Sequence, residues 1–388
     1  MAIIDVCRIT QGTGPALAYV GAMSFPVSLP DRPFARRSAF ILNANARGVS
    51  DRLIERLAEV VPAGDLFLSR TLEDAEIFVR TVARRGYGRV FLGGGDGTLV
   101  STLKLLREVC AKERLNVPEL GVLRLGTGNA MALALGAAEA IVDASHVVNQ
   151  GPIAARPVHF VETDDGTLTP FAGIGYDGAV LNDYFALRAK AKTPLGKKAV
   201  ATVWGYLAAM LFKTVPDELK KKQARVRITT RSEAVAIVAG PHGDEEQAVP
   251  AGTVLYEGPA PVLSVGAIPF FGYGFTMFPH ADRKPGYVQL RVCAVPIPII
   301  LANLFPSVWR GRYRHAKLKD FLVKDVVVES DQELPYQVGG DAHGYRARLG
   351  FKVADQPLSM LALGERLVPQ GHTVLQLGPA RVLLRLPR

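Results

Sequence analysis

Cysteine is scarce in this sequence, and no two cysteines are closely spaced. Cys7, Cys110 and Cys293 lie far apart, and none belongs to a CxxC pair. This spacing argues against a disulfide framework and against a cysteine-ligated zinc site. We therefore expect the protein in a reducing compartment, the cytoplasm.

Long hydrophobic runs are also missing. The cleanest apolar stretch, Ala199 to Phe212, is well short of the roughly 20 residues that a membrane-spanning helix needs. Near the N-terminus, the apolar stretch Ala16 to Phe25 has no basic cluster before it, and Asp5 lies where a signal peptide carries positive charge. The sequence predicts neither a transmembrane helix nor a signal peptide.

Acidic residues are fewer than basic ones, 36 against 46, which gives a formal net charge of +10. Such a surface attracts anionic material, but composition alone does not separate nucleic acid from acidic lipid. The 388 residues, 48% of them hydrophobic, are enough for two domains with buried cores.

The pattern between residues 38 and 150 predicts an α/β layered domain with a mainly parallel sheet. Short apolar runs alternate there with helix-length amphipathic stretches, as in β-α-β connections. The expected strands are 39–42, 65–68, 89–92 and 120–123, and the expected helices are 52–60, 72–84 and 98–110, with a further helix after Gly126.

After residue 151 the pattern becomes strand-like, which predicts a mostly β, sandwich-like second domain. The expected strands are 157–162, 224–230, 235–239, 262–266 and 287–295, with an inserted helix at 197–212. We divide the chain into an N-terminal extension (1–37), an α/β domain (38–150), a β-rich domain (151–325) and a C-terminal segment (326–388). For the last segment, a return to the first domain is one option.

The strongest local signal is a glycine-rich turn that follows the apolar run at 90–92. It reads Gly93-Gly94-Gly95-Asp96-Gly97-Thr98 and leads into a predicted helix. Glycine permits positive φ and close approach to phosphate, and the first amides of the helix are donors for an anion. Asp96 can hold magnesium or orient a nucleophile, and Thr98 can bond a phosphate. A plain strand-to-helix turn would use the same residue types.

A second glycine turn, Leu125-Gly126-Thr127-Gly128-Asn129, again follows an apolar strand. Turns at successive strand ends of one parallel sheet meet at its carboxyl edge, where open α/β sheets bind ligands. Neither turn has the P-loop spacing, and neither gives GxGxxG with a following acid. Ordinary P-loop kinases and dinucleotide dehydrogenases are therefore disfavoured.

With these two turns the sequence resembles the diacylglycerol kinase catalytic family, which includes bacterial lipid kinases, sphingosine kinases and ceramide kinases. The resemblance runs from about residue 38 to 365. Its further matches are Asn43, Asn45 and Gly48 after the first strand, Thr71 in SRTLEDA, the block Phe171 to Asp177, and Phe271-Gly272-Tyr273-Gly274 with Pro279 and Ala281.

The resemblance implies ATP and Mg²⁺ as cofactors, with 38–150 as the ATP-binding domain. The cofactor-binding residues that it implies are Asn43, Asn45, Thr71, Gly94, Gly95, Gly97, Thr98, Gly126, Thr127, Gly128 and Asn129, and it implies Asp96 as catalytic residue and metal ligand.

It also implies a catalytic acid near the C-terminus, where Gly339-Gly340-Asp341 stands in place of the family's Asp-Gly-Glu. Asp341 would accept the proton of the lipid hydroxyl. Aspartate is one methylene shorter than glutamate, so either the loop compensates or Asp96 carries more of this task. His343 is another candidate, and a plain surface turn is the simpler interpretation of this segment.

Two departures from the family pattern limit what is carried over. Ala130 follows Asn129 where the family commonly has Asp, and the block at 285–289 lacks the acids with which some bacterial members bind a structural magnesium. We do not carry that magnesium site over.

Two apolar stretches suit an interfacial enzyme. Lysines flank Ala199 to Phe212, which is equally well explained as a core helix. The stretch Val292 to Trp309 is broken by three prolines and is followed by five basic residues with no acid among them: Arg310, Arg312, Arg314, Lys317 and Lys319. Prolines exclude a continuous helix, and an apolar loop beside cations favours an anionic membrane surface.

The sequence thus predicts an ATP-dependent lipid kinase, peripherally associated with the membrane, that phosphorylates a hydroxyl of diacylglycerol, ceramide or a sphingoid base. Its partners are the membrane lipid substrate and the anionic surface, and not nucleic acid, which would explain neither glycine turn. Two alternatives are a kinase of a soluble alcohol, related to NAD kinases, and a catalytically weak lipid-binding regulatory protein. The acceptor lipid and the oligomeric state stay open.

Overall fold

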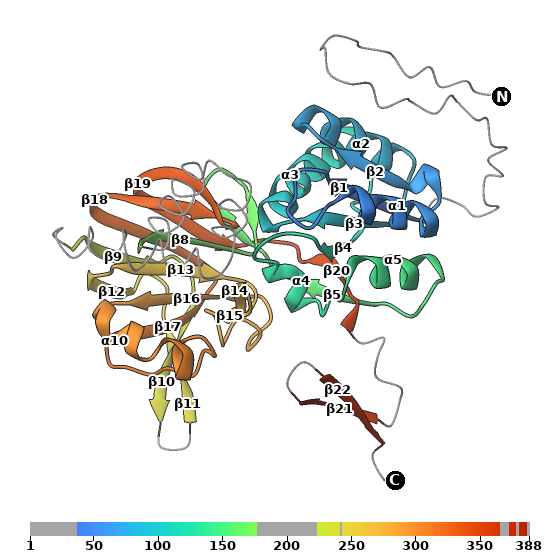
Figure 1. Cartoon of the computed structure of the whole chain (residues 1–388). Coiled ribbons are helices and arrows are strands. Elements are labelled where there is room, and N and C mark those ends of the chain that lie inside the picture. The colour runs from blue at the N-terminus through green and yellow to red at the C-terminus, as the bar shows by residue number, and fades with distance from the viewer. Residues whose placement is uncertain (1–36, 177–222, 241–242, 365–371, 378–379, 386–388) are drawn as a thin grey trace, which may run out of the picture. The chain divides into compact units, whose positions relative to one another are not determined.

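The computed structural model describes residues 37–176, 223–240, 243–364, 372–377 and 380–385 (Figure 1). The expected extension before residue 37 and the expected helix at 197–212 lie outside these residues.

The N-terminal part is built on a six-stranded sheet with the strand order β2-β1-β3-β4-β20-β5. All neighbouring pairs are parallel except β20 with β5. The strands are β1 (Ser38–Asn43), β2 (Leu66–Ser69), β3 (Arg89–Gly94), β4 (Glu119–Arg124), β5 (Ala154–Val158) and β20 (Leu358–Ala362). Because β20 comes from the end of the chain, the C-terminal segment does return to the first sheet.

Helices cover both faces of this sheet. They are α1 (Asp51–Val60), α2 (Leu72–Arg84), α3 (Asp96–Glu113), α4 (Ala130–Ala134) and α5 (Ala140–Val148), with a short 3₁₀ turn η2 (Ala63–Asp65) before β2. Each predicted strand and helix of this part is confirmed to within a few residues.

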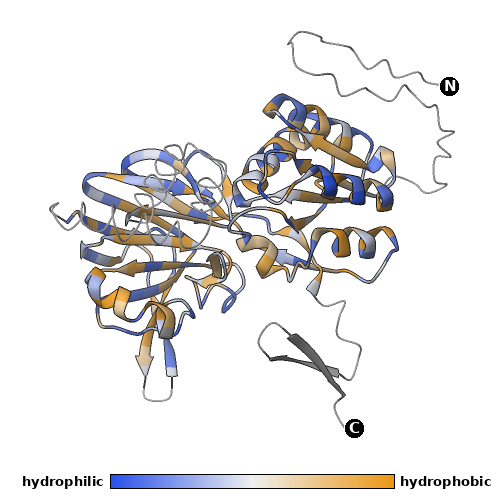
Figure 2. Ribbon diagram, in the orientation of Figure 1, coloured by the Kyte–Doolittle hydropathy of each residue, from blue (hydrophilic) through white to orange (hydrophobic). Residues whose placement is uncertain are grey.

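Alternating side chains along β1 explain the two layers of helices. Ala39 and Ile41 belong to the core that also contains the buried residues of α2 and α3, whereas Phe40 and Leu42 belong to the core of α1 and α5. Successive strand residues point to opposite faces, so a strand that is apolar at every position needs cover on both sides. Figure 2 shows the strands of this sheet mainly in the hydrophobic colour.

The second sheet is large and antiparallel, with the order β11-β10-β17-β16-β13-β8-β18-β19-β6-β7, and β9 joins β18 to β12. Its strands are β6 (Val161–Thr163), β7 (Leu168–Thr169), β8 (Phe171–Gly175), β9 (Arg225–Thr230), β10 (Ala234–Gly240), β11 (Gly243–Val249), β12 (Val254–Pro259), β13 (Val262–Gly266), β16 (Val288–Cys293), β17 (Leu318–Val323), β18 (Asp325–Val338) and β19 (Asp341–Val353). The expected β-rich second part is confirmed.

Smaller elements complete the fold. The hairpin β14 (Phe270–Gly272) and β15 (Phe275–Thr276) lies between β13 and β16, and the hairpin β21 (His372–Leu377) and β22 (Ala380–Arg385) follows β20. Between β16 and β17 the chain forms α10 (Ile297–Ala302) and a π-helical turn, η4 (Leu304–Val308). Within the described part of the chain, no helix combines the length and the apolarity that crossing a membrane requires.

One predicted strand is wrong in a way that has a physical reason. The run 157–162 was expected as a single strand, but its first residues belong to β5 in the first sheet and its last to β6 in the second. His159 and Phe160 separate them, and Phe160 is fully buried. Because both sheets bury apolar side chains, hydrophobicity stays continuous across the crossing and gives no sign of it.

Candidate active site

The strand order places a topological switch point between β1 and β3. The chain leaves β1 toward β2 on one side and later continues from β3 toward β4 on the other. In open α/β sheets, ligands bind outside the carboxyl ends of the strands at such a point. Here Asn43, at the end of β1, donates from Nδ2 to Thr98 Oγ1 at 3.1 Å, so two predicted ligand residues meet across the switch point.

The first glycine turn is shaped by close packing. A β-carbon built on Gly94 would lie 2.5 Å from Thr98 Oγ1, and α3 begins directly afterwards, with Gly95 as its N-cap. None of the glycines 93–97 has a positive φ. Gly93, Gly94 and Gly97 leave room for neighbouring atoms. The expectation that these glycines adopt left-handed backbone conformations is wrong.

The second glycine turn lies in van der Waals contact with the first. A β-carbon on Gly126 would lie 2.3 Å from Gly95 Cα and 2.9 Å from the Gly94 carbonyl oxygen. The expectation that the two turns lie side by side is thereby confirmed. Only glycine at position 126 permits this distance, because carbon atoms normally stay about 3.5–4.0 Å apart.

Asn129 closes the second turn on itself. Its Oδ1 accepts from the Gly126 amide and its Nδ2 donates to the Gly126 carbonyl, both at 2.8 Å. Asn129 itself has φ 55°, a left-handed conformation that asparagine tolerates better than most residues. Both ends of its side-chain amide hold the backbone around Thr127 and Gly128.

Asp96 connects the two turns. Its Oδ2 accepts from the Ala130 amide and its Oδ1 from the Met131 amide, each at 3.0 Å, so the carboxylate caps α4. Burial raises the pKa of Asp96, the hydrogen bonds from Met131 and Ala130 lower it, and the charge of Asp341 raises it further. The net direction is upward.

Asp341 reaches the same place from the other sheet. It follows Gly339 and Gly340, the two central residues of the β18–β19 hairpin turn, which have φ of 58° and 87°. Positive φ at both positions defines a type I′ turn, the connection that matches the twist of antiparallel strands. The Gly339 amide donates to Phe171 O at 2.9 Å, and Gln337 Oε1 accepts from the Gly340 amide at 3.0 Å, so this turn is held firmly.

The carboxylate of Asp341 occupies the space beside Gly97. A β-carbon built on Gly97 would lie 2.0 Å from Asp341 Oδ2. Although the residue is exposed overall, protein packed around its carboxylate raises the pKa of Asp341, and His343 lowers it. Aspartate in place of the family's glutamate therefore still reaches the first glycine turn. His343 packs edge-on against Tyr336, with ring centroids 6.0 Å apart.

A third glycine segment joins this site, and sequence reasoning gave it no function. The Tyr273 amide donates to the Gly128 carbonyl at 2.9 Å. A β-carbon on Gly272 would come within 3.4 Å of Gly128 Cα. Tyr273 has φ 51° in the turn between β14 and β15. The cluster of aromatic and glycine residues at 271–274 was the available signal, but pairing with Gly128 is a long-range contact that no local pattern reports.

Thr71 and Asn45 lie in neighbouring loops at the ends of β2 and β1. Thr71 is the N-cap of α2, where its hydroxyl accepts from the Asp74 amide at 3.1 Å. Asn45 Nδ2 donates to the Arg70 carbonyl at 2.8 Å, and the Asn45 backbone amide donates to Asn43 Oδ1 at 2.9 Å. Both side chains thus order the loops around the strand ends, in addition to any ligand contact.

Comparison with known proteins agrees with this geometry. Residues 37–160 match the sequence profile of the diacylglycerol kinase catalytic domain. A "probable lipid kinase YegS-like" protein of Enterobacter sp. (strain 638) is 28% identical over 258 residues, which is 66% of this chain and 73% of the relative. A protein of the same description from Serratia proteamaculans (strain 568) is 26% identical over 234 residues, 60% of this chain and 64% of the relative.

Among solved structures, a diacylglycerol kinase from Bacillus anthracis strain Sterne superposes with a TM-score of 0.52 and 16% identity, over 84% of this chain and 96% of that one. At this identity the similarity concerns the fold alone. The expected resemblance to the diacylglycerol kinase catalytic family, drawn from the two glycine turns, is confirmed by the sequence profile together with the curated relatives.

Proposed function

We propose that this chain, whose residues 37–160 match the diacylglycerol kinase catalytic domain, is a lipid kinase that transfers the γ-phosphate of ATP to a hydroxyl group of a membrane lipid. The observation that carries the proposal is the contact between the two glycine turns, with Asp96 and Asp341 beside them. Its relatives are described as probable lipid kinases, which supports the same reaction class.

The phosphates of ATP fit the amides at the start of α3. This helix is 18 residues long and its first turn carries Gly97 and Thr98, whose N–H groups have no earlier helical carbonyl to bond. An α-helix N-terminus also carries a partial positive charge, which favours phosphate. In this proposal Gly94, Gly95, Gly126 and Gly128 let the backbone come close to the triphosphate.

Asp341 is our candidate for the general base. In its ionised form it accepts the proton of the lipid hydroxyl while the hydroxyl oxygen attacks the γ-phosphorus in line. A bond forms between that oxygen and phosphorus, the bond to the bridging oxygen of the β-phosphate breaks, and ADP leaves. Asp96 has less freedom for this task, because both its oxygens already accept backbone hydrogen bonds.

The residues present fit a magnesium ion bound together with nucleotide. Among the described residues, no group of three or more His, Cys, Asp or Glu side chains could hold a metal. Magnesium in kinases usually needs only one or two carboxylates, since the phosphates supply other ligands. Asp96 would hold it, with Asp341 as neighbour, and its charge would neutralise the phosphates during transfer. The charge of Asp341 contributes to the raised pKa of Asp96. A cation would relieve this repulsion between the two carboxylates.

The proposal is tested by incubating the protein with ATP labelled in its γ-phosphate and a total lipid extract, then identifying the labelled products. We expect one class of phospholipid product, formed about 10²–10⁴-fold more slowly by Asp341→Asn. Label in a water-soluble alcohol and not in lipid would favour the soluble-substrate kinase. No transfer to any acceptor, combined with retained binding to lipid vesicles, would favour a regulatory lipid-binding protein.

A further inference from the structure

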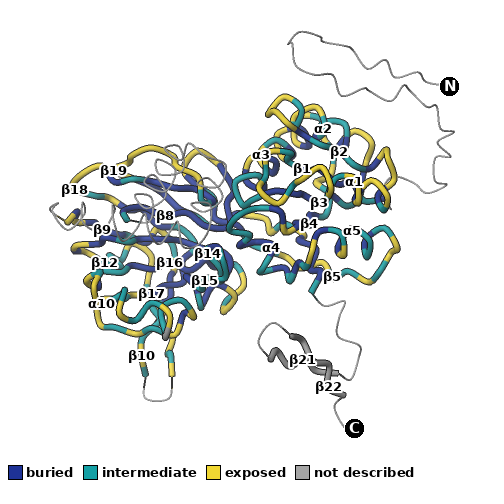
Figure 3. Tube along the Cα trace, in the orientation of Figure 1, coloured by how far each residue is buried: buried dark blue, intermediate teal, exposed yellow. Residues whose placement is uncertain are grey.

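The segment between β16 and β17 presents apolar side chains outward. The helix α10 has the sequence Ile-Pro-Ile-Ile-Leu-Ala, yet none of its six residues is buried. In Figure 3 it carries only the intermediate and exposed colours. Ile299 is 41% exposed and Phe305, in η4, is 53% exposed. These two side chains define the apolar patch.

Cations follow this patch directly in the sequence. From residue 310 to 319 the sequence contains five Lys and Arg residues and no Asp or Glu. The basic border consists of Arg310, Arg312, Lys317 and Lys319, all exposed. Within the described ranges, none of the four forms an ion pair. No acidic side chain among the residues that the structure describes therefore pairs with these four cations, whereas Arg314 pairs with Asp244.

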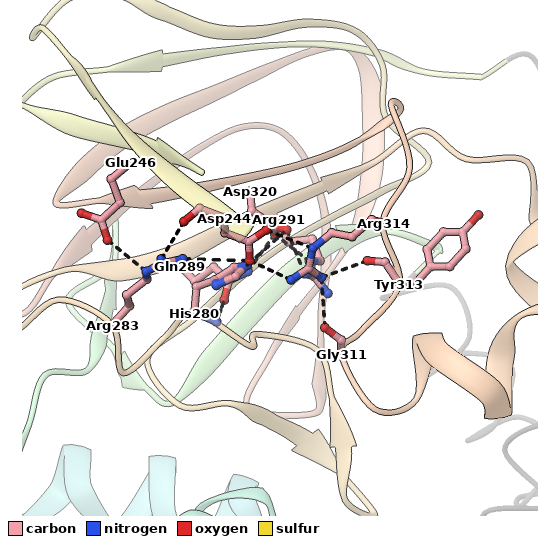
Figure 4. A network of polar contacts seen from close by, with 10 residues as sticks. All are labelled: Asp244, Glu246, His280, Arg283, Gln289, Arg291, Gly311, Tyr313, Arg314 and Asp320. Carbon is pink, nitrogen blue, oxygen red and sulfur yellow. Dashed lines mark hydrogen bonds and ion pairs between the residues drawn. The ribbon is translucent and has the colours of Figure 1, made fainter. Parts of the chain in front are cut away.

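Arg314 instead fastens the segment to the sheet below it. Its Nη2 donates to Asp244 Oδ2 at 2.8 Å and its Nε donates to Asp244 Oδ1 at 3.2 Å, a bidentate pair with the start of β11. The pair holds the pKa of Asp244 below its usual value. Figure 4 shows Arg314 reaching this network from the end of the segment, while the ring of Tyr313 points away from it.

Beneath it, a buried network joins three further elements. Asp320 accepts from Arg291 Nε at 2.7 Å and Nη2 at 2.9 Å, and from Gln289 Nε2 at 2.7 Å. Gln289 Oε1 in turn accepts from the His280 amide at 2.7 Å. The end of the segment is thus attached through Arg314 to a part of the sheet that buried hydrogen bonds hold together.

Aromatic contacts connect the patch to the candidate active site. Phe305 stacks on Trp309 with ring centroids 5.9 Å apart, and Trp309 contacts Phe275 of β15 at 5.4 Å. The same β14–β15 hairpin carries Tyr273, whose amide bonds Gly128 of the second glycine turn. Phe305 is thus linked through Trp309 to the hairpin that contacts the second glycine turn.

We infer that the apolar patch and its basic border dock this protein on the surface of an anionic lipid bilayer. Ile299 and Phe305 insert among the acyl chains near the headgroups, while the four cations bind anionic headgroups. Short apolar helices bordered by arginine and lysine suit the headgroup region of an anionic bilayer. Exposed aliphatic side chains, in contrast, do not contribute to binding a nucleic acid. The inference rests on the proposed function, because a lipid acceptor must be reached in its membrane.

Flotation with vesicles tests the apolar part. The full chain is mixed with phosphatidylcholine vesicles that contain or lack phosphatidylglycerol. The variant Ile299→Glu/Phe305→Glu is expected to lose at least about tenfold in binding to anionic vesicles, since each side chain would leave the apolar layer. The matched control Ile77→Glu/Val142→Glu changes two comparably exposed apolar residues, 60% and 49% exposed, on α2 and α5, and should bind within about twofold of the wild type.

The charged part has its own pair of variants. Arg310→Glu/Arg312→Glu should lower binding to anionic vesicles by roughly tenfold or more, leaving weak binding to pure phosphatidylcholine unchanged. Arg52→Glu/Arg56→Glu makes the same change in charge on exposed positions of α1 and should have much less effect. Unchanged binding of either patch variant, or wild-type protein that binds no vesicle, would overturn the inference.

An assay of phosphate transfer to lipid dispersed in detergent distinguishes a loss of membrane docking from a failure of the proposed kinase function. The patch variants should keep wild-type activity in detergent and lose it on vesicles. A wild-type protein that binds anionic vesicles through the patch but phosphorylates no lipid in either form would leave the docking surface standing and refute the kinase.

Discussion

Substituting alanine at the contact between the two glycine turns tests the architecture of the site most sharply. In Gly126→Ala, the new methyl group would lie 2.3 Å from Gly95 Cα, so the turns must separate by about 1 Å or more to restore a normal carbon contact. Overpacking of this kind costs about 1–3 kcal/mol. A displacement of that size beside reacting groups also lowers catalytic efficiency by roughly 10²-fold.

Gly95→Ala provides the matched control on the other side of the same contact. A β-carbon there would meet nothing closer than Gly126 Cα at 3.7 Å, an ordinary contact, and the φ of −92° suits alanine. Thermal melting of each variant without nucleotide should show a lower melting temperature for Gly126→Ala only. Equal behaviour of the two variants would refute the close contact of the turns.

Three further predictions follow from the carboxylates. Asp341→Asn should lower phosphate transfer by about 10²–10⁴-fold, as the loss of a general base does. The raised pKa of Asp341 means that folding disfavours its ionised form, so Asp341→Asn should also melt slightly higher at pH 7. The stability advantage of Asp341→Asn should shrink as the pH falls through the raised pKa toward the unfolded value near 3.9, because wild-type Asp341 then becomes protonated and neutral. A stability advantage that grows at low pH would contradict this pH dependence. Asp96→Ala should abolish transfer and also destabilise the fold by about 1–3 kcal/mol, because it leaves the Ala130 and Met131 amides without their acceptor; an unchanged melting temperature would count against this capping role. Arg291→Met should be more damaging to stability than either, by about 3–5 kcal/mol in urea unfolding, since Asp320 would remain buried with an unpaired charge.

The sequence predicted the first sheet well because its signals are local. The strand at Arg89–Gly94 is apolar along its length, and the capping box of α2, formed by Thr71 and Asp74, fixes where that helix begins. Two glycine turns after successive parallel strands must meet at one edge of the sheet, so their contact was also within reach.

The rest depends on contacts between segments far apart in the chain. The capping of α4 by Asp96 spans more than thirty residues, and the bond from Tyr273 to Gly128 spans far more. The return of β20 to β4 rests on a five-residue run whose partner no local pattern names. Such pairings come from tertiary packing, which neither periodicity nor turn chemistry encodes.

The position of the Asp341 carboxylate beside the first glycine turn was likewise not predictable from the local sequence. The two glycines before it indicated only a turn, and a surface loop explained them as well. Positive φ at both Gly339 and Gly340 makes the tight hairpin that, with the bond from Gly339 to Phe171, brings a short carboxylate beside Gly97. Asp341, although one methylene shorter than glutamate, thus lies beside the first glycine turn because of the backbone geometry of the hairpin. The sequence alone left this geometry undetermined.

A crystal structure of the full chain with magnesium and a non-hydrolysable ATP analogue would test the central claim most directly. We predict a triphosphate that accepts hydrogen bonds from the Gly97 and Thr98 amides, lies against Gly126 and Gly128, and places its γ-phosphate next to Asp341. A nucleotide bound elsewhere, or a triphosphate that touches only one of the two glycine turns, would contradict the account.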